Sequence, residues 1–168
     1  NSDKSLDLNL ESSVDDRLST SGYKSNLTGF SLGTNFEYLD DLRFGLSSRN
    51  SIEKITVDSK ASEKQKKQEG NYFDNFLGMD FNYDKRNQKF QTTDGFFSRY
   101  LVDIPIVSDT NTLTNTYNYK IFEELYENNV STLSFLLKSS NSISGDDVKL
   151  SERLYIPGRR LRGFEAGK

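Results

Sequence analysis

The side chains with the clearest capacity for chemistry are three arginines near the C-terminus, Arg159, Arg160 and Arg162, which stand among glycine, leucine and phenylalanine. An arginine guanidinium forms two parallel, charge-assisted hydrogen bonds to a carboxylate or a phosphate. Taken alone, the segment is compatible with a solvent-exposed Arg/Gly loop or with a basic patch that binds nucleic acid. The rest of the chain has to decide between these uses.

The composition excludes several kinds of site. The 168 residues carry a net charge of −3, so global electrostatics do not indicate nucleic acid as a partner. The chain has no Cys and no His, which removes disulfides, thiolate and imidazole nucleophiles and most zinc and haem sites. The 25 Asp and Glu residues leave a carboxylate-only enzyme open, but no acid pair converges at a recognisable spacing. We therefore expect no enzymatic activity, no catalytic residues, no metal and no cofactor.

The balance of apolar and aromatic residues indicates β-structure. Only 33% of the residues are hydrophobic, yet 12% are aromatic, with two Pro and no Trp. Transmembrane β-barrels have such a composition, because only every second strand residue faces lipid. The lack of a long apolar run excludes a transmembrane helix but not a membrane protein.

Alternation of apolar and polar residues predicts seven strands. In the first, Leu6, Leu8 and Leu10 alternate with polar residues, and the others lie within 27–38, 42–47, 73–83, 96–106, 117–126 and 132–138. In the stretch 117–126 the parity breaks, which predicts a bulge. Most strands exceed the ~5–6 residues usual in globular proteins, and several reach the ~9–11 needed to cross a bilayer.

The parity also predicts which side chains share a face. We expect one set on the convex face of a curved sheet, namely Leu8, Phe30, Phe44, Leu77, Tyr100 and Phe135. We expect the other set on the concave face, namely Asn9, Gly33, Arg43, Asp80, Arg99 and Ser134. A soluble sandwich alternates too, but aromatic residues near the strand ends favour a barrel with interfacial girdles.

The predicted connections alternate in length. Short turns are expected at 37–41, 92–95 and 127–130, and longer polar loops at 15–21, 56–70 and 107–116. Outer-membrane barrels have short periplasmic turns and longer external loops. We assign no chemistry to the charged loop 58–69.

Two motifs resemble those of one family. The triplet Arg162-Gly163-Phe164, flanked by Tyr155, Gly158 and Glu165, resembles the sixth-loop motif of the Omp85 superfamily of outer-membrane barrels, of the bacterial surface antigen D15 type. The run 81–95, which contains Asp84, Arg86, Asp94 and Gly95, resembles a second pattern of that family, although Thr92 stands where the family usually has Pro. Gly95 is expected to supply the positive φ of a tight hairpin turn.

The resemblance implies an all-β antiparallel meander, a partial transmembrane barrel of about seven out of about sixteen strands. Residues 1–144 would form the barrel strands, and 145–168 the start of the sixth external loop, folded into the lumen. Arg162 would be the lumen anchor, Gly163 would permit the loop tip and Phe164 would pack on the wall. Glu152 and Tyr155 would position the loop base, and the charges Asp80, Asp84, Arg86, Arg99 and Asp103 would pair across strands. We expect the chain to be a piece of a larger protein.

The resemblance further implies a function in the bacterial outer membrane. One interpretation is a machine that folds and inserts client β-barrel proteins, with outer-membrane lipid, client polypeptides and accessory lipoproteins as partners and no nucleic acid. The alternative is a polypeptide translocation pore of the same superfamily, and a third possibility is a porin or adhesin barrel. The number of periplasmic POTRA domains in the longer protein would separate the first two.

Overall fold

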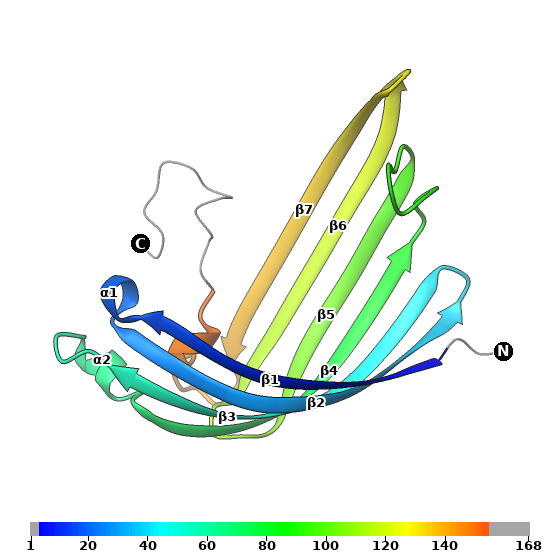
Figure 1. The fold of residues 1–168 in the computed structure, drawn as a ribbon. Helices are drawn as coiled ribbons and strands as arrows, with labels where there is room; N and C mark the ends of the chain where they lie inside the picture. Colours follow the sequence, from blue (N-terminus) through cyan, green and yellow to red (C-terminus); the bar gives the residue numbers. More distant parts are fainter. Residues whose placement is uncertain (1–3, 155–168) are drawn as a thin grey trace.

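The computed structural model describes residues 4–154, which form one seven-stranded sheet where each strand pairs antiparallel with its sequence neighbours. The strands are β1 (Lys4–Arg17), β2 (Tyr23–Leu39), β3 (Leu42–Val57), β4 (Gly70–Asp84), β5 (Gly95–Ser108), β6 (Thr112–Tyr126) and β7 (Asn129–Ser142). The helices within the described residues are α1 (Leu18–Ser21), α2 (Glu63–Lys66) and the 3-10 helix η1 (Leu150–Glu152). The predicted all-β antiparallel meander is confirmed (Figure 1).

The strands are long, with 14 to 17 residues each. This exceeds the ~9–11 residues that a tilted strand needs to cross a bilayer. Within the part of the chain that the structure describes, no helix is long and apolar enough to span a membrane.

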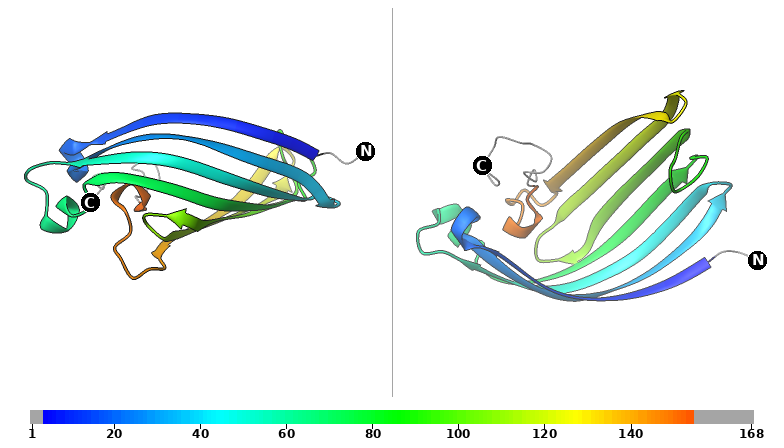
Figure 2. Two further views of the ribbon diagram at one scale, coloured as in Figure 1. Left: turned by 90° about the horizontal axis from the view of Figure 1, so that it is seen from below. Right: turned by 45° about the horizontal axis from the view of Figure 1, so that its top comes forward.

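The sheet curls into an open trough (Figures 1 and 2). We call one end the helix-bearing end, because α1, α2, residues 109–111 and residues 143–154 lie there. We call the other the hairpin end, because it carries the connections 40–41, 85–94 and 127–128. After β7 the chain turns back into the concave side of the trough, so the last described segment lies inside the curve (Figure 2).

The register confirms the predicted division into two faces. Leu8 pairs with Leu32, and Ser48 pairs with both Leu32 and Leu77, so these side chains form one row on the convex face. On the concave face Gly33, Ser47, Gly78 and Asp103 form the corresponding row. Convex leucines remain open to the surroundings, with Leu8 66% and Leu133 68% exposed, as a lipid-facing surface would require.

Aromatic rings form a ladder across four strands of the convex face. Phe36 lies 5.6 Å from Phe44, Phe44 lies 5.0 Å from Phe81, and Phe81 lies 6.4 Å from Tyr100, measured between ring centroids. A second row joins Tyr83, Phe96 and Tyr119. Contacts of this kind stabilise neighbouring strands by ~0.5–1.5 kcal/mol beyond burial. The ladder lies toward the hairpin end, where a barrel would have an interfacial girdle.

The predicted alternation of loop lengths is wrong at the middle of the sheet. The turn expected at 92–95 belongs to a longer connection, residues 85–94, and the long loop expected at 107–116 is reduced to residues 109–111. Polar residues such as Thr114 and Asn115 continue β6, since their strand partners complete the ladder. The charged loop 58–69 contains a short helix, since Ser62 and Gln65 form a capping box that begins α2.

The predicted bulge in β6 is confirmed close to its end, where the register shifts between Glu124 and Tyr126. Phe122 precedes the shift and lies in the regular ladder opposite Thr132. A further register shift between Asn75 and Phe76 in β4 leaves Ile106 of β5 outside the ladder. Asp74 already has the concave parity of Gly78 and Asp80, and this second bulge reverses the parity of β5, so that Ser108 reaches the same face and donates to Asp74.

Candidate functional site

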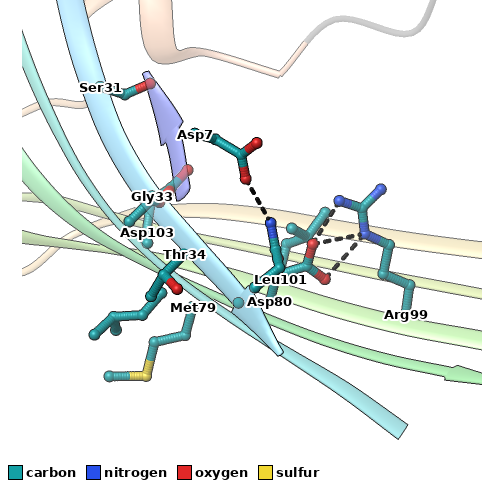
Figure 3. A pocket seen from close by; sticks show the side chains of 14 residues that line it. Asp7, Ser31, Gly33, Thr34, Met79, Asp80, Arg99, Leu101 and Asp103 are labelled. Carbon is teal, nitrogen blue, oxygen red and sulfur yellow. Dashed lines mark hydrogen bonds and ion pairs between the residues drawn. The ribbon is translucent and has the colours of Figure 1, made fainter. Parts of the chain in front are cut away.

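Ionised side chains face each other across the middle of the concave wall. Arg99 of β5 donates to Asp80 of β4, with Nε–Oδ1 at 3.0 Å and Nη2–Oδ2 at 2.6 Å (Figure 3). Arg49 of β3 reaches Asp103 of β5 at 3.6 Å. These two acids thus pair across strands as expected. The pairs are partly exposed, so each contributes only ~0–1 kcal/mol to stability, and their main effect is to keep the wall polar.

Glycines make room for these polar side chains in a hollow of about 260 Å³ (Figure 3). A Cβ on Gly78 would lie 2.5 Å from Ser47 Oγ and 3.0 Å from Asp103 Oδ1. A Cβ on Gly45 would lie 2.5 Å from Asn35 Oδ1. Larger residues at these two positions would therefore displace the polar groups that line the hollow.

The hairpin end holds the predicted pair Asp84 and Arg86. The Arg86 Nε and Nη2 atoms donate to the two Asp84 oxygens, each at 2.7 Å, and the guanidinium lies 5.2 Å from the centre of the Phe97 ring. The hydrogen-bonded carboxylate raises the pKa of Arg86 above its usual range. The pair is local, two residues apart, and not the cross-strand pair expected from sequence.

Asn87 organises the connection 85–94, because its side chain joins the next residue, Gln88, to Thr93, six residues further on. Its Oδ1 accepts from the backbone N–H of Gln88 at 2.9 Å and of Thr93 at 3.2 Å, and its Nδ2 donates to Thr93 Oγ1 at 2.7 Å. Gly95 has the expected positive φ, 96°, but it begins β5 instead of forming the centre of a tight turn. Asp94 contributes its backbone carbonyl, which accepts from Asn87 N–H at 3.1 Å.

The helix-bearing end contains the most enclosed charges of the described residues. Lys149 Nζ lies 2.9 Å from Glu53 Oε2 and 3.3 Å from Glu152 Oε1, and it also donates to Asp74 Oδ2. The side chains of Lys149, Glu53 and Asp74 are 3%, 2% and 2% exposed. Three separate elements, β3, β4 and η1, therefore bring carboxylates to one ammonium group.

Hydroxyl groups complete the surroundings of the two strand carboxylates. Glu53 accepts from Ser25 of β2 and, at 3.0 Å, from Ser151 of η1. Asp74 accepts from Ser108 of β5. Carboxylates buried this deeply are stable only when hydrogen bonds replace the water that they lose.

An apolar contact lies directly beside the charges. Tyr23, Ile55 and Leu150 are buried together, with Val57 and Tyr72 packed against them. The Lys149 ammonium lies 5.4 Å from the centre of the Tyr72 ring. Leu150 is 0% exposed, so the segment after β7 is held by packing as well as by charge.

The electrostatics of the cluster favour a charged lysine. Burial alone lowers the pKa of Lys149, but Glu152, Glu53 and Asp74 outweigh it and hold the pKa well above its ordinary 10.5. Burial raises the pKa of Glu152 above 4.5, and Lys149 offsets only part of this. Within residues 4–154 no group of three or more acidic, His or Cys side chains is arranged to hold a metal ion.

A model of the Omp85 superfamily domain matches residues 1–168, which is the whole chain. The chain belongs to the Omp85 superfamily. Its fold is similar to that of BamA from Haemophilus ducreyi lacking POTRA domains 1-3, with a TM-score of 0.83 at 20% sequence identity. The similarity covers 98% of this chain and 35% of that one, so the chain spans about a third of its length. Comparison with curated protein sequences gave no match.

The sixth-loop motif expected for an Omp85 protein lies outside the described residues. This applies to Arg162, Gly163 and Phe164, and to the supporting residues Tyr155, Gly158 and Glu165. The role expected for each of them therefore stays a prediction. The division into strands at 1–144 and an inward-folded loop at 145–168 also stays a prediction.

The parity that places Asp80 on the concave face applies to Asp74 as well, and Glu152 was expected at the base of the loop. Sequence reasoning missed Lys149 and Glu53. A signal was available for Glu53, which has the same parity as Arg43 and Gly45 on the concave face of the Omp85 sheet. For Lys149 no local pattern exists, because its partner Asp74 is 75 residues away.

Proposed function

We propose that this Omp85 protein folds and inserts client β-barrel proteins into the bacterial outer membrane, as a BamA-like assembly factor. The support is the Omp85 assignment over the whole chain together with the similarity of the fold to a BamA barrel. Outer-membrane lipid, client barrels and accessory lipoproteins would be its partners. The work is not enzymatic: an apolar outer surface disturbs the bilayer, and strand edges template client strands.

The two faces of the sheet fit this function. The convex face presents leucines and an aromatic ladder to lipid, while the concave face carries ion pairs and glycines. A polar interior also suits the alternative, a translocation pore that passes a partner polypeptide through its lumen. Barrels of the same family perform both functions, so the experiment has to show whether the other polypeptide ends up folded in the bilayer or delivered across it.

The test reconstitutes the intact protein in liposomes and adds a urea-denatured client barrel protein. An insertase accelerates the appearance of a folded, protease-resistant and heat-modifiable client in the bilayer. A translocation pore instead delivers a soluble partner polypeptide into the liposome interior, where external protease cannot reach it. Client folding no faster than in empty liposomes contradicts the proposed function.

A further inference from the structure

The charged cluster at the helix-bearing end joins parts of the chain that are far apart in sequence. Lys149 and Glu152 lie after the last strand, whereas Glu53 and Asp74 are on β3 and β4. Around it, Ile143 N–H donates to Asn111 O at 2.8 Å, and Ser140 Oγ donates to Glu152 O at 3.0 Å. The segment is therefore fixed at its beginning and its end.

We propose that Lys149, Leu150 and Glu152 form a latch, closed on Glu53 and Asp74, which holds the start of the segment 149–168 against the concave wall and positions that segment for function. The positioning role rests on the proposed assembly function. The latch itself is a property of the fold and can be tested separately.

The burial of the charges shows why this contact fixes one geometry. Ser25 donates to Glu53 Oε1 and Ser108 donates to Asp74 Oδ1. Asp74 Oδ2 and Glu53 Oε2, which also accepts from Ser151, lie against Lys149 Nζ. An ammonium group removed from this position leaves two buried carboxylates without a counter-charge, which is strongly unfavourable. Leu150, the next residue, packs at the same time on Tyr23 and Ile55, so charge and packing hold the segment in one position.

The latch limits where the downstream segment can reach. A chain spans at most ~3.3–3.6 Å per residue, so Arg162 stays within roughly 35 Å of Glu152. If the latch opens, the segment can leave the trough from residue 143 onward.

The first experiment measures opening of the latch by cysteine labelling in the intact, membrane-inserted protein. Leu150→Cys reports on the closed state because Leu150 is 0% exposed, and Ile143→Cys, at a position 61% exposed, is the reference for free access. The described chain adds no competing thiol, since its sequence has no Cys. With a membrane-impermeant maleimide, we expect Leu150→Cys to react at least about tenfold more slowly than Ile143→Cys.

Added to the Leu150→Cys protein, Lys149→Met should raise its labelling rate by about tenfold or more, because two buried acids lose their counter-charge. Lys149→Arg, which keeps the charge, should raise it much less. The matched control is Lys138→Met on the concave face of β7, which removes a lysine that makes no ion pair with any described residue. Unchanged labelling in Lys149→Met, or an equal rise in Lys138→Met, overturns the latch.

The second experiment tests the positioning role through rescue. A disulfide between Ile55→Cys and Leu150→Cys joins two residues of the same buried cluster and closes the latch covalently. In the Lys149→Met background, client insertion should fall, and oxidation of the cysteine pair should restore most of it, while reduction should remove the gain. If the latch opens but insertion is unaffected, or if the closed disulfide gives no rescue, the positioning role is wrong.

The labelling and insertion experiments give different results when the proposed function fails and when the latch fails. A native protein that inserts no client contradicts the proposed function, while the labelling of Leu150→Cys still decides whether the latch exists. If the native protein inserts clients but the Leu150→Cys variant is labelled rapidly, the proposed latch is wrong and the proposed function is unaffected.

Discussion

Lys149 keeps its charge in a buried place, and this fixes the sign of its response to pH. Its pKa is raised in the folded protein, so the stability that it contributes is fully present below 10.5 and is lost as pH rises through the folded-state pKa. The groups that face it are Glu53, Asp74, Glu152 and the Tyr72 ring. Glu152 has a raised pKa too, so ionising it at rising pH also weakens the folded state.

We therefore predict that Lys149→Met lowers the free energy of unfolding by ~3–5 kcal/mol near neutral pH, because a buried ion pair loses one partner. The difference between the native protein and the variant should shrink above about pH 10.5. Urea unfolding of both proteins across this pH range measures it. A difference that stays constant into strong alkali contradicts the assigned charge state.

Arg162 and Arg159 offer a second comparison between single residues. The Omp85 motif predicts that Arg162 pairs with acids in the lumen, whereas Arg159 is expected in solvent. Arg162→Ala should then cost ~3–5 kcal/mol if its site is dry, and Arg159→Ala ~0–1 kcal/mol. Complementation of growth and the heat-modifiability of the barrel on gels are the measurements. Equal behaviour of the two variants removes the motif assignment.

The connection between β4 and β5 depends on the glycine with which β5 begins. Gly95 has φ 96°, and a Cβ there would collide with the backbone carbonyl of Lys85. Gly145 also has a positive φ, 86°, but a Cβ there would meet nothing within 4 Å. An alanine at Gly145 would therefore suffer backbone strain alone, whereas an alanine at Gly95 would suffer both strain and a steric collision.

We predict that Gly145→Ala costs ~1–2 kcal/mol from strain alone, and that Gly95→Ala costs more because the loop 85–94 has to move as well. The midpoints of urea unfolding in detergent measure both variants. Equal shifts would show that the Lys85 carbonyl moves aside without penalty.

The two faces of β7 make a further prediction about the strand in a membrane. Leu133 belongs to the convex face and Ser134 to the concave one, and both side chains are exposed in the described sheet. In liposomes, a water-soluble maleimide should label Ser134→Cys and leave Leu133→Cys largely unreacted, because water fills a polar lumen but not lipid. Equal labelling in the membrane contradicts the assignment of the faces.

The assembled sheet exposes apolar leucines over its convex face, and β1 and β7 each have one unpaired edge among the described residues. Surfaces and edges of this kind associate in water. We predict that residues 1–168 expressed alone form no monodisperse monomer without detergent. Size-exclusion chromatography with and without detergent tests this, and a single cooperative, monomeric species in plain buffer would refute it.

Most of the fold could be predicted from local sequence patterns. Side chains of a strand alternate between the two faces of the sheet, so one apolar residue assigned to a face also assigns its neighbours along the strand. This is why Phe44, Leu77 and Tyr100 could be placed correctly on one face before the register was known. Loop lengths were harder to predict, since polar residues such as Thr114 are equally suited to a loop and to the lumen face of a strand. Asn87 orders its loop by hydrogen bonds that no spacing rule anticipates.

The site was less predictable than the fold because its contacts are distant in sequence. Asp80 and Arg99 pair across one hairpin, and strand parity suffices to bring them together. The position of Lys149 depends on the bend after β7 and on the packing of Leu150, and the hydroxyl that supports its partner Asp74 depends on the bulge that turns Ser108 inward. None of these features leaves a periodic signal. Distant contacts of this kind require the assembled sheet.

The distance in sequence between Lys149 and Asp74 also sets an order in time. Hairpins between neighbouring strands close short loops and form early, whereas a contact across 75 residues has to wait until β3 to β7 have assembled. Interactions made after the folding transition state slow unfolding and leave the folding rate nearly unchanged. The ion pairs of Lys149 would therefore form late, only on a sheet whose strands are already in register. Once formed, they would slow the unfolding of that sheet.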